Sequence, residues 1–114
     1  MALHKEQERI CRELGNKAGL QASLGNQALI LKARGDLEGA MALHKEQERI
    51  CRELGDKAGL AISLINQASI LGQKGNQTKD ALSLADKAYR LASEYGYIVL
   101  AKQIEDIRSK IRGH

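Results

Sequence analysis

The sequence predicts an all-α protein made of repeated antiparallel helix pairs, with about six helices in 114 residues. The first fifteen residues recur without a change at 41–55, so one helical segment is used twice. A composition rich in Ala, Leu, Glu, Lys and Gln favours helix over strand. Glycines follow the apolar helical stretches twenty residues apart, at Gly15, Gly35, Gly55 and Gly75.

The repeat continues beyond the identical segment with a period of 40 residues. Residues 16–36 and 56–76 share 12 of 21 positions. The apolar positions that they share are spaced by four, four and three residues, which places them on one face of a helix. These positions are Leu20 and Leu60, Leu24 and Leu64, Ala28 and Ala68, and Leu31 and Leu71.

Turn residues set the predicted helix bounds. Each glycine, with Gly96 slightly late, suits the left-handed residue that ends a helix. The polar residue types that start helices by accepting backbone N–H bonds come next, at Asn16, Asp36, Asp56 and Asn76. We therefore expect helices at about 1–14, 17–34, 36–54, 57–74, 77–95 and 97–112.

The segment 37–54 forms the second helix of a pair and has a broad buried face. Its outward residues can support the helix through Glu48–Arg52 and Arg49–Glu53 ion pairs. The width of the face fits a helix that packs on both its partner and the next repeat. The residues predicted on this face are Leu37, Ala40, His44, Gln47, Cys51 and Leu54, with Leu43 and Ile50 beside them.

The third copy is degenerate. Residues 80–96 realign with 39–55 after one inserted residue, and the realignment puts alanines opposite His44, Gln47 and Cys51. The last helix keeps an apolar stripe and carries its charges elsewhere, as a terminal cap does. We expect 1–114 to be a single repeat domain in which 97–114 is the C-terminal cap.

Charge and hydropathy exclude several classes. Net charge is +4, but 18 basic and 14 acidic residues are interleaved, so no basic patch for nucleic acid is expected. No apolar run approaches the roughly 18 residues of a membrane span. Cys11 and Cys51 occupy the same repeat position, and we interpret them as two reduced thiols of a cytoplasmic protein.

His44, Glu48 and Cys51 lie within one arc of a helix, and zinc accepts such ligands. The same arc holds Leu37 and Ala40, so we interpret His44 and Cys51 as packing residues. His44 and Cys51 are also two turns apart, too far for a nucleophile and base on one helix. We expect no enzyme activity and no metal or cofactor, with a metal at these residues or their copies left open.

The run "GDLEGAMAL" at 35–43 resembles the turn and small alanine of tetratricopeptide repeats. The 40-residue period is longer than the usual 34 and resembles the longer subclass in Leu-Gly-Asn repeat (Pins-type) scaffold proteins. Leu24-Gly25-Asn26 and the stretch from His44 to Asp56 carry this likeness. The second copy departs from it, because residues 64–66 read Leu-Ile-Asn.

The resemblance implies a right-handed α–α superhelix whose first helices line a concave groove for a peptide or helical ligand. Asn26 and Asn66 are of most interest, since an Asn side chain can both donate to and accept from an extended ligand. Carried over by position, the groove candidates are Ala22, Gly25, Asn26, Leu29 and Lys32, then Ile62, Ile65, Asn66, Ser69 and Gln73.

The sequence starts with a second helix, so we expect a piece of a longer array, natural or engineered. Such a helix would leave apolar residues uncovered, and exposed apolar surface favours association. We therefore expect a homodimer or higher oligomer. The alternative to a peptide-binding module is a structural or engineered repeat fragment with no ligand, which self-associates through Leu3, Ile10 and Leu14.

Overall fold

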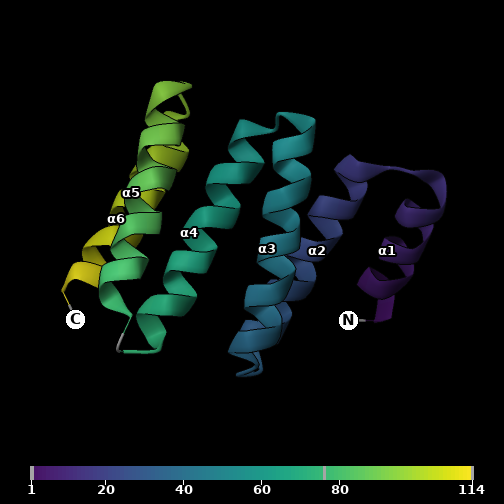
Figure 1. The fold of residues 1–114 in the computed structure, drawn as a ribbon, viewed down its shortest axis with the longest axis horizontal. Helices are drawn as coiled ribbons and strands as arrows, with labels where there is room; N and C mark the ends of the chain where they lie inside the picture. Colours follow the sequence, from purple (N-terminus) through teal and green to yellow (C-terminus); the bar gives the residue numbers. More distant parts are fainter. Residues whose placement is uncertain (1, 76, 114) are drawn as a thin grey trace. The chain divides into compact units, whose positions relative to one another are not determined.

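A computed structural model describes residues 2–75 and 77–113, and within these ranges the chain is all-helical, without strands. This confirms the all-α prediction and the number of helices. Every predicted helix bound lies within one residue of the observed one. The helices are α1 (Ala2–Leu14), α2 (Lys17–Ala33), α3 (Leu37–Leu54), α4 (Lys57–Gln73), α5 (Thr78–Glu94) and α6 (Ile98–Arg112) (Figure 1).

Glycines end the helices as predicted. Gly15, Gly35, Gly55, Gly75 and Gly96 all have positive φ, between 67° and 89°. At the end of α3, the N–H after Gly55 donates to the carbonyl of Cys51 at 2.9 Å, which satisfies an otherwise unpaired helix carbonyl. Left-handed backbone of this kind favours glycine because other residues meet a steric penalty there.

Two of the predicted helix starts are capped by side chains. Asn16 and Asp36 each accept a bond from the backbone N–H three residues later, at 2.9 Å. The start predicted at Asn76 lies outside the described residues. The helix after it, α5, begins beyond Gln77, which makes no such side-chain bond.

The chain divides into two compact units, Met1–Asp56 and Lys57–His114. In the first unit, α2 runs antiparallel to α1 and α3 and packs against both (Figure 1). The core of this unit gathers Leu20, Leu24 and Ile50, with the half-buried Leu43 against them. Leu20 and Leu24 belong to the apolar α2 face that the repeat shares, so the predicted helix face is confirmed here.

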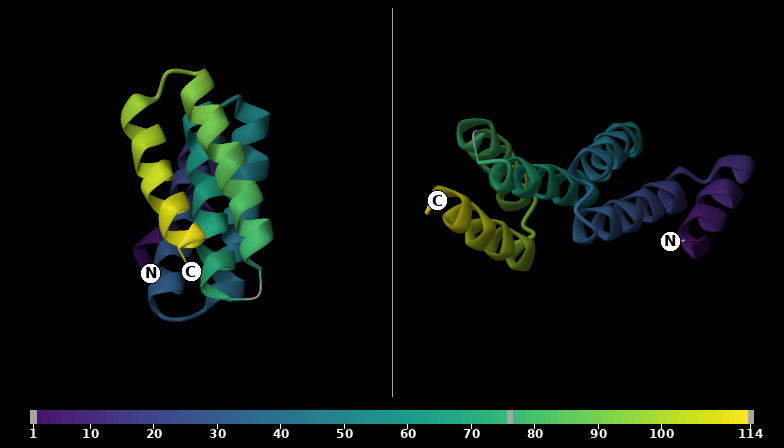
Figure 2. Two further views of the ribbon diagram at one scale, coloured as in Figure 1. Left: turned by 90° about the vertical axis from the view of Figure 1, so that its left-hand side faces the viewer. Right: turned by 90° about the horizontal axis from the view of Figure 1, so that it is seen from below.

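In the second unit, α5 packs between α4 and α6, and α6 also touches α4. Figure 2 shows α6 beside α5. Small residues bring α5 close to its neighbours, since Ala81, Ala85, Ala88 and Ala92 are all fully buried. A Cβ placed on Gly72 of α4 would lie 3.2 Å from Cγ1 of Ile111, so α6 approaches α4 closely. The single domain over 1–114 stays a prediction.

Candidate interaction surfaces

The predicted groove residues of the first unit lie on an accessible part of α2. Asn26 is exposed, Leu29 keeps 49% of its surface in solvent, and Lys32 is half-buried. Asn26 also lines a shallow hollow with Gln7 and Ile10 of α1. The structure thus places the groove candidate Asn26 next to the self-association candidate Ile10, although the two are 16 residues apart in the sequence.

The predicted groove residues of the second unit lie on α4. Ile62 is 40% exposed, Asn66 and Ser69 are half-buried, and Gln73 is exposed. Ser69 and Gln73 line an open hollow of about 560 Å³ together with Ile111 and its neighbours on α6. The C-terminal end of the α4 candidate face is therefore bordered by α6.

Two further groove residues that the family resemblance implies are not accessible. Gly25 and Ile65 are both buried. A Cβ on Gly25 would lie only 2.6 Å from Nε2 of Gln47, so Gly25 faces α3. Successive residues of a helix differ by about 100°, and this turn separates Gly25 from its accessible neighbour Asn26.

The glutamines beside the two asparagines have a different role. Nε2 of Gln27 donates to Ser23 Oγ at 3.3 Å and to Glu8 Oε1 of α1 at 2.9 Å. Gln67 repeats the first bond with Ser63, at 3.2 Å. The repeated Ser-x-x-x-Gln spacing was a signal for this buried pair that our sequence reasoning missed.

The exposed apolar surface expected on α1 is present at two of the three named residues. Leu3 keeps 77% and Ile10 keeps 42% of its surface in solvent. The side chain of Leu14, the third residue, lies outside the described part of the chain.

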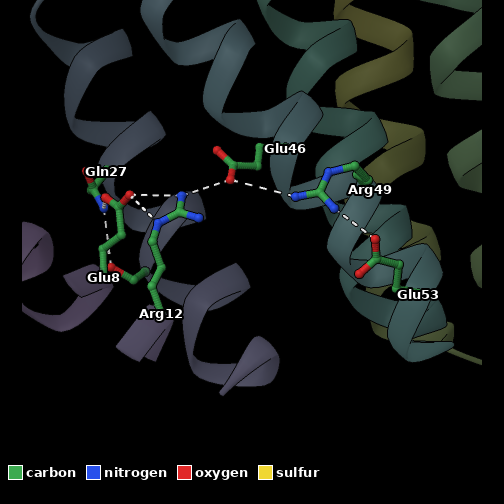
Figure 3. Close-up of polar contacts among 7 residues, drawn as sticks. Glu8, Arg12, Gln27, Glu46, Arg49 and Glu53 are labelled. Carbon is green, nitrogen blue, oxygen red and sulfur yellow. Dashed lines mark hydrogen bonds and ion pairs between the residues drawn. The ribbon is translucent and has the colours of Figure 1, made fainter. Parts of the chain in front are cut away.

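A chain of ion pairs crosses the first unit. Arg12 of α1 reaches Glu8 on its own helix at 3.0 Å and Glu46 of α3 at 2.8 Å. The chain continues from Glu46 through Arg49 to Glu53 along α3 (Figure 3). The Arg49–Glu53 pair was predicted, whereas the bridge from Arg12 to Glu46 needed the fold. Exposed pairs contribute at most about 1 kcal/mol each, so these ion pairs add little to the stability of the unit.

The packing interpretation of His44 and Cys51 is confirmed, because both side chains are fully buried. Nδ1 of His44 bonds to Oε1 of Gln47 at 3.1 Å, and Sγ of Cys51 donates to Gln21 Oε1 at 3.5 Å. Burial lowers the pKa of His44 and raises the pKa of the Cys51 thiol to about 11. Both groups are therefore uncharged near neutral pH.

No group of three His, Cys, Asp or Glu side chains within the described residues is arranged to hold a metal ion. The His44, Glu48 and Cys51 arc is thus not a cluster, because Glu48 turns to Arg52 at 2.9 Å. The side chains of His4 and Cys11, the copies in α1, lie outside the described part of the chain.

An apolar patch at the turn between α5 and α6 was not foreseen. Ile98 and Val99 are each 71% exposed, and Tyr95 and Tyr97 beside them are 48% and 37% exposed. The Nζ of Lys57 lies 5.6 Å from the centre of the Tyr95 ring, a cation–π distance. Adjacent Ile and Val at a helix start were the available sequence signal.

Comparison with known proteins assigns no family. No protein-family model matches the chain, and none of the curated proteins searched matches it. Within the described residues, no helix is long and apolar enough to cross a membrane.

Proposed function

We propose that this chain is a non-catalytic helical-repeat module of the tetratricopeptide type, which binds a peptide or a helix of a partner protein. The binding surface in this proposal is the groove face, defined by Asn26, Leu29 and Lys32 of α2 and by Ile62, Asn66, Ser69 and Gln73 of α4. The proposal keeps the α–α superhelix that the resemblance implies, with the α2 residues in the first unit and the α4 residues in the second.

The observation that carries the proposal is the contrast between neighbouring polar residues. Gln27 and Gln67 are buried and bonded within the fold, whereas Asn26 is exposed and Asn66 half-buried. Both asparagines belong to an Asn-Gln pair that occurs in both copies of the repeat. A repeated amide that packing does not bury can bond the backbone of an extended ligand.

Apolar side chains next to these amides supply contact area. Leu29 is three residues after Asn26, and Ile62 is four residues before Asn66, so each pair shares a helix face. Leu29 and Ile62 expose 49% and 40% of their surfaces. A ligand that covers them gains burial while the amides fix its direction.

The test uses a display library of twelve-residue peptides, selected on the 114-residue chain. Selected peptides are then titrated against Asn26→Ala and Asn66→Ala variants, with Lys45→Ala, an exposed change on α3, as the matched control. We expect each Asn variant to weaken binding about threefold to tenfold, the value of one lost hydrogen bond. A library that yields no binder, or binders indifferent to both asparagines, would refute the groove face.

The burial of Cys51 and His44, the candidate nucleophile and the candidate base, supports the absence of catalysis in this proposal. Cys51 is fully buried, and a thiol with a pKa of about 11 is almost entirely protonated at neutral pH. His44 is buried beside Gln47 rather than beside a nucleophile. We also propose that the protein is cytoplasmic, a proposal supported by Cys51, which is a free and buried thiol.

Self-association is the second candidate function, and the exposure of Leu3 and Ile10 favours it. In this alternative the chain forms a homodimer or a higher oligomer through α1 and has no other ligand. Light scattering over a hundredfold range of concentration tests it. A molar mass that rises above the monomer supports the alternative, and a constant monomer mass contradicts it.

A further inference from the structure

The exposed side of α1 has an internal duplicate whose covering is visible. Because residues 1–15 and 41–55 are identical, Leu3 and Ile10 correspond to Leu43 and Ile50 of α3. In α3, Ile50 is only 2% exposed, and it packs with Leu43 against two leucines of α2, Leu20 and Leu24. The same apolar surface is thus covered by an α2 helix in one copy and exposed in the other.

The polar part of this contact is equally specific. Gln47 donates from Nε2 to Oε1 of Gln21 at 3.1 Å, and its side chain lies directly over Gly25. Gln7 is the residue of α1 that corresponds to Gln47, and it is exposed. A helix that covers α1 in the same way needs glutamine and glycine at the positions of Gln21 and Gly25.

The second unit has other residues at the positions of Gly25 and Gln47. In α4 the position of Gly25 is taken by Ile65, and in α5 the position of Gln47 is taken by Ala88. Ile65 and Ala88 are both buried and α4 packs against α5, so the alignment pairs a large residue of α4 with a small one of α5, the reverse of Gly25 and Gln47. Since α1 carries the large Gln7, it suits a helix of the α2 kind and not one of the α4 kind.

A side wall for such a helix is also present. Gln7 and Ile10 of α1 border a hollow whose other side is formed by α2, at Gly19, Ala22 and Asn26. A helix lying over Leu3 and Ile10 therefore runs next to α2 rather than across open solvent.

We propose that the α1 face, defined by Leu3, Gln7 and Ile10, binds in trans a helix of the α2 type supplied by another repeat protein. The recognised pattern is Leu-Gln-x-x-Leu-Gly, as in residues 20–25. This inference uses the same α1 surface as the self-association alternative, but assigns to it a helix of another protein in place of a second copy of the chain. It is independent of the groove face.

The probe is a fluorescein-labelled peptide of residues 16–36, titrated by anisotropy into the 114-residue chain. The peptide carries Ala22→Lys and Asn26→Asp, at two positions exposed in α2, and a lactam formed between these side chains with loss of water holds it helical, so that weak folding alone cannot abolish binding. We expect saturable binding. The matched peptide with Gly25→Ile, bridged in the same way, should bind at least about tenfold more weakly, because isoleucine overpacks against Gln7.

Variants of the chain locate the bound peptide. Leu3→Asp together with Ile10→Asp should abolish binding, whereas Leu29→Asp, a change of an equally apolar exposed residue on the groove face, should leave it unchanged. Absence of saturation by the bridged peptide overturns the inference, as does equal binding of the Gly25→Ile peptide. Binding that survives the α1 double variant also overturns it, since the peptide would then be replacing the internal α2. Loss of binding in Leu29→Asp but not in the α1 double variant would show that the peptide binds the groove face, and this result would also overturn the inference.

Discussion

The identical segments allow the effect of side-chain burial on stability to be measured while the local sequence stays the same. Ile10 and Ile50 have the same neighbours in sequence for nine residues before and five after, but expose 42% and 2% of their surfaces. We predict that Ile50→Ala destabilises the first unit by about 3–4 kcal/mol and Ile10→Ala by about 1 kcal/mol.

These values follow from the atoms removed. Ile→Ala deletes about three methylene equivalents at about 0.8 kcal/mol each, or about 2.4 kcal/mol of transfer free energy when all are buried. At Ile50 a cavity closed by Leu20 and Leu24 adds to this loss. At Ile10 only part of the side chain is covered, and solvent enters the space that alanine leaves.

Urea unfolding followed by far-ultraviolet circular dichroism measures both changes as differences in the free energy of unfolding. The protein is kept at low concentration so that association through α1 does not contribute. Intrinsic helix propensity cancels, because the substitution and its local sequence are the same at both sites. Losses that agree within about 0.5 kcal/mol would refute the assignment of Ile50 to the core and Ile10 to the surface.

Three further outcomes are expected. Burial lowers the pKa of His44 from its ordinary 6.5, so below about pH 6.5 the unfolded chain binds a proton that folded His44 does not. The free energy of unfolding should therefore fall as the pH drops, and it should fall less steeply in His44→Asn. Urea unfolding between pH 7.5 and 5.5 measures both slopes. In a Cys11→Ser variant at pH 8, iodoacetamide should modify Cys51 about 100-fold more slowly in the folded chain than in urea. The reason is that burial raises the pKa of the Cys51 thiol from 9.0 to about 11. Equal rates by mass spectrometry would contradict the burial of Cys51. Gly25→Ala should cost about 1 kcal/mol by displacing the Gln47 side chain, and the cost should vanish in the Gln47→Ala background, as a double-mutant cycle by thermal unfolding can establish.

The helices could be predicted from the sequence because local signals agreed. Leu20, Leu24 and Ala28 mark one face, and Gly35 with Asp36 marks the turn that follows. The buried state of these apolar residues then confirmed the helix face. Periodicity and turn chemistry act within about 20 residues, so they are visible without the fold.

The contacts between helices were harder to predict. Arg12 bonds Glu46 from 34 residues away, and nothing in either segment alone specifies that partner. The inward side of Gly25 was missed for a related reason: a family likeness assigns a position to a groove, whereas a neighbouring side chain, Gln47, decides whether it is accessible. Leu54 was expected in the buried face but is 42% exposed, since it is the last residue of α3.

The close approach of α6 to α4 covers one side of the second unit. Ile111 fits against Gly72, and α6 also covers α5, so this side of the second unit is already filled by the chain's own helix. Leu3 and Ile10 leave the opposite kind of surface on α1, one that still accepts a helix. The α1 face is therefore the surface that our inference assigns to a helix supplied in trans, whereas Gly72 of α4 already contacts a helix of the same chain.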